Sequence, residues 1–373
     1  MADYLENTLL NLVGTDTAVP TGTTEILPGD THLYDTVTSA VLPMVEALGP
    51  DEILRHPCGD IAARFGPDTP DGLMLQTYIV SQHGNLMTDP QQGRIVDGAA
   101  LNLDGPAVVG QGANQNKGPM AAALSAVREL RSLRRAVWLT VNCEGRSSHD
   151  GSRRIYEDLG VRAAQSIIAF GTNLHVSLGN RGRVDIRVTV SGAAAHSSQP
   201  ELGRNPIPPA AEIVGRLPEV PLPPPHPELG PATATPYQFQ CEPIAPHTLP
   251  SRVHVVVDRR LLPGEDPDAA VAAVRRQLDG SWPELEVVAG AAMFPALVDP
   301  SAPVVGALAG FPTMYSRNAF DAGYGCSVGV PTVMFGPGRR DFGAGVVHAE
   351  AVSISDCRIA AAALAKAART LCG

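Results

Sequence analysis

The chain has 373 residues, of which 44% are hydrophobic and 18% charged, a composition typical of a folded protein of about two or three domains. Its net charge of -10 argues against a nucleic-acid partner, because phosphate binding needs a basic face. No apolar run approaches the ~20 residues of a membrane span. The N-terminal segment lacks the basic region of a secretory signal, and the six cysteines lack CxxC spacing, so we expect a cytoplasmic protein with reduced thiols and no membrane partner.

The N-terminal half alternates predicted helices with short apolar runs. Apolar side chains at helical spacing predict helices at 4–14, 34–48 and 119–133, the last of which begins with a proline. Short apolar runs predict buried strands at 72–81, 136–142 and 166–171. This alternation predicts a layered α/β domain with a mainly parallel sheet, whose functional loops follow the carboxyl ends of the strands.

A different pattern begins near Arg181. An alternating strand (183–192), a helix (206–217), a proline-rich linker, two further strand-like runs, a helix (267–278) and a last strand follow one another. This β-α-β-β-α-β order is that of a small ferredoxin-like α+β domain. The α/β pattern returns near Phe294. We therefore predict a discontinuous α/β domain of residues 1–180 and 294–373, with an inserted domain at 181–293.

The most informative motif is GQGANQNKG at 110–118. It resembles the GRGxxDxKG loop of the acetylornithine deacetylase, succinyl-diaminopimelate desuccinylase and carboxypeptidase family, which are dizinc aminoacyl and peptide hydrolases. Other motifs follow in the family's order at 196–207 (HSSQPELGRNPI), 257–265 (VDRRLLPGE), 320–325 (FDAGYG) and 333–338 (VMFGPG). The resemblance covers nearly the whole chain, and it implies a zinc-peptidase-like catalytic domain with an inserted dimerisation or lid domain.

On the substrate side, the family's motif residues are intact. The resemblance implies a homodimer in which His196 reaches the neighbouring subunit's active site and polarises the substrate carbonyl. It places Asn205 and Arg260 on the residues that bind the substrate's carboxylate or backbone, a role that suits the rigid fork of arginine.

On the metal side, most of the family's ligands are replaced. The first motif, H-x-D, keeps His83 but has Asn85, and the bridging aspartate is Gln115. His348 fits the last metal histidine. The segment 170–173 (FGTN), where another acidic ligand is expected, holds only Thr172 and Asn173.

The family's Glu-Glu pair, which supplies a general base and a zinc ligand, falls on VNCEGRSSHDGS. Two registers are open. In one, Cys143 and Glu144 take the two places, so that the ligand is kept and the base is lost. In the other, Ser147 and Ser148 replace both glutamates.

Charge decides what this site can hold. Two zinc ions about 3.5 Å apart repel each other by roughly 20 kcal/mol at an effective dielectric constant of 20, and anionic ligands must offset that. One remaining carboxylate is too few, so the sequence predicts no dizinc centre and no cofactor. A single zinc on His83, Glu144 and His348 is the alternative, since two histidines and a glutamate form a known catalytic set.

These features predict an enzyme that acts on an amide or amino-acid-derived small molecule without a dizinc centre, by acyl transfer, amide formation or cyclisation, elimination or metal-independent hydrolysis. His83, Glu144 and His348 are its acid-base candidates, and Cys143 is a candidate nucleophile. The amides of Gln115 and Asn85 could hold substrate groups by hydrogen bonds. The alternatives are a one-zinc amidohydrolase or peptidase and a non-catalytic ligand-binding protein.

Overall fold

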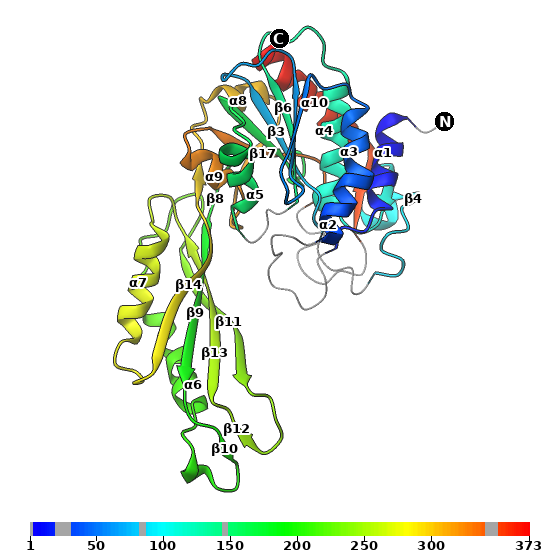
Figure 1. Cartoon of the computed structure of the whole chain (residues 1–373). Helices are drawn as coiled ribbons and strands as arrows, with labels where there is room; N and C mark the ends of the chain where they lie inside the picture. Colours follow the sequence, from blue (N-terminus) through cyan, green and yellow to red (C-terminus); the bar gives the residue numbers. More distant parts are fainter. Residues whose placement is uncertain (1–2, 19–30, 82–86, 144–147, 340–349) are drawn as a thin grey trace. The chain divides into compact units, whose positions relative to one another are not determined.

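The computed structural model describes residues 3–18, 31–81, 87–143, 148–339 and 350–373 (Figure 1). The chain divides into two compact units. Unit 1 comprises Met1–Gly179, Ala296–Tyr315 and Asp321–Gly373, and unit 2 comprises Asn180–Pro295 and Ser316–Phe320. Among the described residues, no helix is both long enough and apolar enough to cross a membrane.

Unit 1 is built on a nine-stranded sheet in the order β1-β2-β6-β3-β7-β17-β8-β15, with β16 paired to β8. Its strands are β1 (Glu52–Arg55), β2 (Ile61–Phe65), β3 (Leu73–Tyr78), β6 (Val137–Asn142), β7 (Gln165–Ala169), β8 (Val176–Asn180), β15 (Ala296–Leu297), β16 (Thr313–Ser316) and β17 (Thr332–Phe335). The central strands β6, β3, β7 and β17 run parallel, and every residue of β3 and β6 is buried. Continuous apolar runs mark such strands because helices cover both faces of the sheet.

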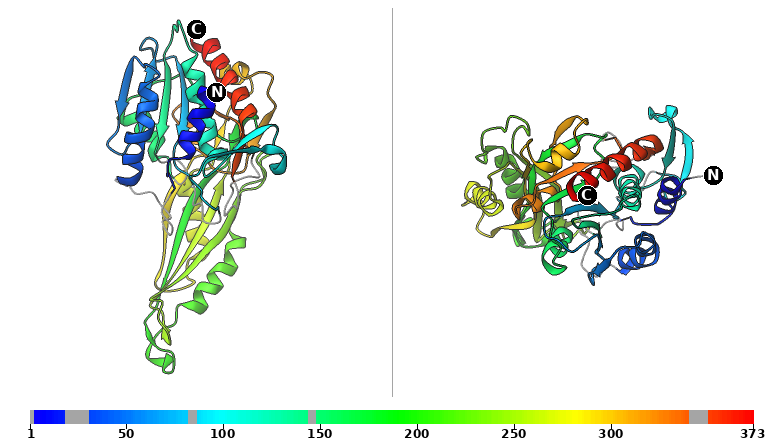
Figure 2. Two further views of the ribbon diagram at one scale, coloured as in Figure 1. Left: turned by 90° about the vertical axis from the view of Figure 1, so that its right-hand side faces the viewer. Right: turned by 90° about the horizontal axis from the view of Figure 1, so that it is seen from above.

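Helices cover one face of this sheet in a single large core, in which α1, α4 and α10 pack side by side (Figures 1 and 2). The helices of this face are α1 (Tyr4–Val13), α2 (Thr31–Thr36), α3 (Leu42–Glu46), α4 (Gly118–Arg128), α8 (Pro303–Ala307) and α10 (Ile354–Cys372). A second core, which includes Met74 and Trp138, lies on the opposite face. The short helices α5 (Asp150–Arg153) and α9 (Ala322–Ser327) contact each other. Helix α5 directly precedes Ile155, which belongs to this second core. The predicted α/β fold class of this unit is confirmed.

Local sequence explains where two of these helices begin and end. Asp3 caps α1, since its carboxylate accepts a hydrogen bond from the Glu6 amide at 2.9 Å. Helix α4 ends at Arg128, earlier than the predicted limit of 133, and Ser132 beyond it adopts a left-handed φ of 55°. The strands β4 (Arg94–Asp97), β5 (Pro106–Val109) and β18 (Ala351–Ser353) form a small antiparallel sheet. In the sequence, β4 and β5 precede the motif at 110–118, and β18 follows it.

Unit 2 has the predicted β-α-β-β-α-β order. Its sheet runs β11-β13-β9-β14, with all pairs antiparallel, and α6 (Ile207–Arg216) and α7 (Pro267–Leu278) pack on one face. The strands are β9 (Gly182–Ser191), β11 (Thr233–Glu242), β13 (Arg252–Leu261) and β14 (Leu285–Met293). Alternate residues of β9 and β13, mainly valines, fill the core, as the period of two in the sequence predicts. A two-stranded ribbon joins β10 (Ala195–His196) to β12 (Thr248–Leu249).

Candidate functional site

The loop 110–118 wraps around one buried carboxylate. The Glu350 side chain accepts hydrogen bonds from the backbone amides of Gly112 (2.8 Å), Asn114 (3.2 Å) and Gln115 (3.1 Å). A π-helical turn, Ala113–Lys117, then leads directly into α4. Turns of this kind often occur at functional sites. Because charge-assisted bonds to backbone amides are strong, Glu350 fixes the shape of the loop.

The same loop contacts the residues that follow three parallel strands. The Asn114 side chain donates to the Arg339 carbonyl and accepts from the Arg339 amide, both at 2.7 Å. The Gly171 amide donates to the Gln115 carbonyl at 3.2 Å, and the Asn116 side chain donates to the Val80 carbonyl. The carboxyl ends of β3, β7 and β17 therefore meet at this loop, which is where ligands bind in open α/β sheets.

Gln115 is half-buried in this arrangement. Its backbone is held by Glu350 and Gly171, so the loop keeps a defined shape although the residue at the bridging position is a neutral amide. Thr172 serves the backbone: its hydroxyl donates to the His175 carbonyl at 2.7 Å and accepts from the Gly336 amide at 3.1 Å. Asn173 beside it is exposed.

Lys117, in the same loop, is completely buried. Its ammonium donates to the Thr15 carbonyl at 2.8 Å. Burial lowers the pKa of Lys117 to about 8, while the charges of Glu350 and Asp16 act in the opposite direction. Because Lys117 bonds the Thr15 carbonyl from inside the loop, it helps to hold the loop against the segment that follows α1.

Cys143 follows β6 and is buried. Its amide donates to the Asp60 carboxylate at 2.9 Å, and Asp60 also forms a buried ion pair with Arg154. Burial raises the pKa of Asp60, and the hydrogen bond and charge of Arg154 oppose that rise. Gly59 adjoins the thiol so closely that a Cβ at position 59 would lie 2.8 Å from its Sγ. The thiol is thus tightly packed.

The sequence did not predict a buried hydrogen-bonded network of three side chains at the end of β3. The Nδ1 of His149 donates to one carboxylate oxygen of Asp321 at 2.7 Å, and the Tyr78 hydroxyl donates to the other at 2.8 Å. Both His149 and Asp321 are less than 10% exposed. The motif around Asp321 and the end of the strand at Tyr78 were visible in the sequence, but nothing in it pairs them with His149. This network ties the segment after β6 to the end of β3, so the three side chains position those loops.

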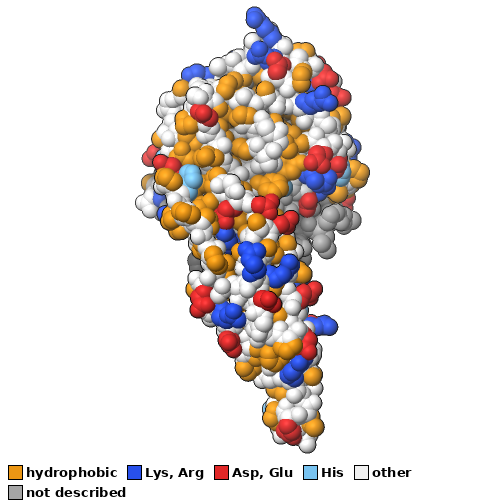
Figure 3. All heavy atoms as spheres, turned by 90° about the vertical axis from the view of Figure 1, so that its left-hand side faces the viewer, with side chains coloured by type: hydrophobic (Ala, Val, Ile, Leu, Met, Phe, Trp, Pro, Cys, Tyr) orange, Lys and Arg blue, Asp and Glu red, His pale blue; other side chains and the backbone are white. Residues whose placement is uncertain are grey.

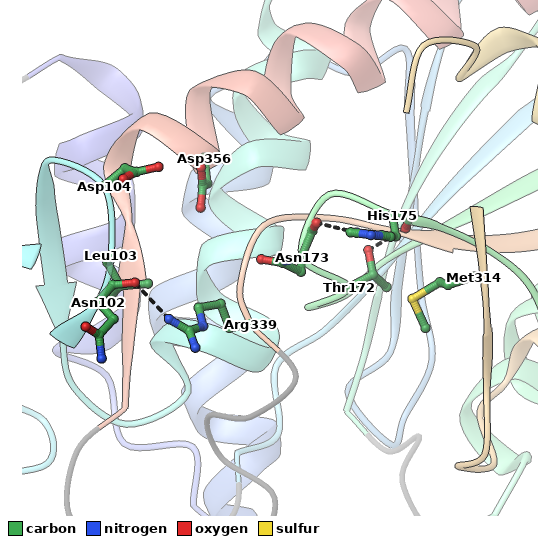
Figure 4. A pocket seen from close by; sticks show the side chains of 9 residues that line it. All are labelled: Asn102, Leu103, Asp104, Thr172, Asn173, His175, Met314, Arg339 and Asp356. Atoms are coloured by element: carbon green, nitrogen blue, oxygen red, sulfur yellow. Dashed lines mark hydrogen bonds between the residues drawn. The ribbon is translucent and has the colours of Figure 1, made fainter. Parts of the chain in front are cut away.

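A cavity of ≈ 660 Å³ opens beside Arg339 in unit 1 (Figure 4). It is lined by Asn102, Leu103, Asp104, Thr172, Asn173, His175, Met314, Arg339 and Asp356. The Arg339 guanidinium donates to the Asn102 carbonyl at 2.7 Å, and the His175 Nδ1 donates to the Asn173 carbonyl at 2.6 Å. The cavity adjoins the loop through Arg339, and the side chains of Thr172, His175 and Arg339 are engaged with backbone carbonyls.

The three predicted substrate-binding residues of unit 2 lie on different elements. His196 is exposed in β10, where its Nδ1 bonds the Ser198 hydroxyl at 2.7 Å. The Asn205 side chain accepts from the Ile207 amide at 3.1 Å, at the start of α6. The Arg260 fork binds the Asp258 carboxylate through two bonds of 2.6 and 2.7 Å.

Four predicted site residues, His83, Asn85, Glu144 and His348, lie outside the described residues, as does Ser147 of the alternative register. Within the described part of the chain, no three His, Cys, Asp or Glu side chains form a group that could hold a metal ion. The described residues named above supply the frame of the loop.

Comparisons with known proteins agree with this architecture. Residues 178–286 match the M20 peptidase dimerisation domain. The M20 family metallo-carboxypeptidase Sso-CP2 from Sulfolobus solfataricus superposes with a TM-score of 0.78 at 17% identity, covering 99% of both chains. Human carnosine dipeptidase 1 superposes with a TM-score of 0.73 at 16% identity, covering 98% of this chain and 96% of the dipeptidase.

The match to one relative by sequence covers a smaller share of that relative. The uncharacterized protein YgeY of Escherichia coli (strain K12) is 25% identical over 265 residues, which are 67% of this chain and 62% of YgeY. The matched region thus spans less than two thirds of that relative. Together the comparisons confirm the resemblance: the chain has the M20 peptidase fold and carries that family's dimerisation domain.

The same comparisons correct one prediction. The sequence led us to expect no cofactor, whereas the fold is that of a metallo-carboxypeptidase, which works with a metal. The reason for the error is physical. Repulsion between two zinc ions argues against a dizinc centre, because several anionic ligands are needed to offset it. A single ion has no neighbouring cation, so it does not need that many anionic ligands.

Proposed function

We propose that the protein is an amide-bond hydrolase of the dipeptidase or carboxypeptidase type that uses one metal ion rather than two. The observation that carries this proposal is Gln115, a neutral amide at the bridging position of a loop whose backbone is otherwise held firmly by Glu350. A bridging carboxylate offsets the repulsion between paired cations, and an amide does so poorly.

The proposal assigns the single ion to His83, Glu144 and His348, because two histidines and one glutamate form a donor set that zinc accepts. A bound ion of this kind would polarise the scissile carbonyl. The described residues have supporting roles: Glu350 shapes the loop, and His149, Asp321 and Tyr78 join the segments that lead toward those ligands.

The substrate is assigned as a small peptide or N-acylated amino acid with a free carboxylate. Carnosine dipeptidase 1 and Sso-CP2, whose folds this chain shares, are named as a dipeptidase and a carboxypeptidase. Arg260 is the proposed carboxylate anchor. Its Nε and Nη2 are bonded to Asp258, which leaves the Nη1 edge of the guanidinium for a substrate oxygen.

Hydrolysis of a panel of dipeptides and N-acetylated amino acids tests this function. We expect turnover that stops on removal of metal with a chelator and returns when zinc is added. His83→Ala should abolish turnover, while the control His254→Ala, on the unit 2 sheet beside Thr189, should not. Turnover that survives chelation, or that survives His83→Ala, would show that the proposal is wrong.

A further inference from the structure

Three arginines come together within unit 2. Arg181 precedes β9, and its backbone amide donates to the Ser316 carbonyl at 3.2 Å, which brings the segment 316–317 beside it. The Arg181 side chain is buried, and its Nε and Nη2 donate to the Leu229 carbonyl at 2.8 and 2.6 Å. Arg181 thus anchors the turn that ends at Gly230.

Gly230 shows how close the cations are. A Cβ at this position would lie 3.1 Å from the Nη2 of Arg181 and 3.8 Å from the Nη2 of Arg317, so these two nitrogens are within about 7 Å of each other. Gly230 has a φ of +71°, a conformation that side chains other than glycine adopt with strain. A side chain at this position would crowd the guanidinium group of Arg181.

Arg260 completes the cluster. Arg260 of β13 pairs with Arg183 of β9, two residues along the chain from Arg181. Burial lowers the pKa of Arg181, and the charges of Arg317 and Arg260 lower it further. Asp258 binds Arg260. In the described part of the chain, neither Arg181 nor Arg317 has an ion pair with an acidic side chain. Acidic and basic side chains intermingle on the face drawn in Figure 3.

Three cations against one carboxylate repel each other, and the repulsion is strongest around the buried Arg181. Its bonds to Leu229 explain the position of Arg181 but not the approach of Arg317, which is exposed. Arginine guanidinium groups match planar carboxylates. The Nε and Nη2 of Arg181 are bonded to Leu229, so Arg181 offers its Nη1 and its charge. Arg317 offers a fork that has no acidic partner among the described residues.

We propose that Arg181, Arg260 and Arg317 bind a dicarboxylate group, so that the preferred substrate carries an acidic residue beside its free carboxylate. This inference rests on the proposed function in taking the bound group to be part of a substrate. Binding itself is independent of turnover, so each idea can fail separately.

Titration calorimetry on the full chain tests it with glutarate, butyrate and inorganic phosphate. We expect glutarate to bind about tenfold more tightly than butyrate, and Arg317→Gln to weaken glutarate binding by about fivefold or more, the effect of losing a charge-assisted hydrogen bond. Arg181→Gln should act in the same direction. Because Arg181 is buried and its variant could misfold, the exposed Arg317 carries the test.

Arg204→Gln is the matched control. Arg204 lies elsewhere in unit 2, where it pairs with Glu284 at 2.8 Å, and its loss should leave glutarate binding unchanged. Equal affinity for glutarate and butyrate, tighter binding of phosphate, or an equal loss in Arg204→Gln would overturn the inference. Glutarate binding without peptide hydrolysis would refute the proposed function alone, and hydrolysis without selective glutarate binding would refute this inference alone.

Discussion

Lys117 gives a test of the loop that depends on pH. In the folded protein its pKa falls from 10.5 to about 8 because the ammonium is buried. Burial therefore disfavours the charged form in the folded protein. Below pH 8, lysine is charged in both the folded and the unfolded protein, and the folded protein bears the whole loss of stability. Above pH 10.5 lysine is neutral in both states, and this loss is absent. This shift corresponds to about 3 kcal/mol. Relative to Lys117→Met, the wild-type protein should gain about that much stability between pH 8 and 10.5.

The assay is urea unfolding of wild type and Lys117→Met at steps of pH, with the difference in unfolding free energy plotted against pH. Taking the difference removes the titration of tyrosines and cysteines, which both proteins share. Lys366→Met is the control, because Lys366 is the chain's other lysine and is exposed in α10. A difference between wild type and Lys117→Met that stays constant over this pH range would refute the reasoning.

Three other substitutions test the frame of the site by thermal or urea unfolding. Glu350→Gln replaces a carboxylate that accepts from three backbone amides with an amide group that has only one acceptor atom. It should lower the free energy of unfolding by about 2–4 kcal/mol. An unchanged unfolding midpoint would contradict this role of Glu350. Gly338→Ala would place a Cβ 2.1 Å from a backbone carbonyl oxygen, so it should cost clearly more than Gly264→Ala, where φ is also positive but nothing lies within 4 Å; equal losses would point to backbone strain alone. Asp321→Asn should destabilise by about 2–4 kcal/mol, because it leaves buried His149 with a weaker partner; a loss below 1 kcal/mol would argue against the buried network.

Much of the fold could be predicted from the sequence because the signals are local. The apolar runs at 72–81, 136–142 and 166–171 became β3, β6 and β7, and alternation at 183–192 became β9. The end of α4 was not visible, since Leu130 and Leu133 continue the apolar spacing past Arg128. Local periodicity indicates an element's type, but packing fixes where the element stops.

The site was harder to predict, because its contacts join distant parts of the chain. His149 and Asp321 are 172 positions apart, and Glu350 is 235 positions from Gln115. No spacing rule links such residues. The motifs identified the family's loop, and only the three-dimensional structure showed that Glu350 supports it. The expectation of no cofactor is contradicted by the fold, which is that of a metallo-carboxypeptidase. The replaced ligands argue against a pair of ions, and that argument does not extend to a single ion.

The most direct test of the central claim is the metal content of the protein purified without chelator, measured per protomer by elemental analysis. We expect about one zinc ion in the wild type, and a second, more weakly held ion in Gln115→Asp, which restores a bridging carboxylate. Gln115→Asn, equal in size to the aspartate variant but neutral, should stay at one. Two ions in the wild-type protein would contradict the account.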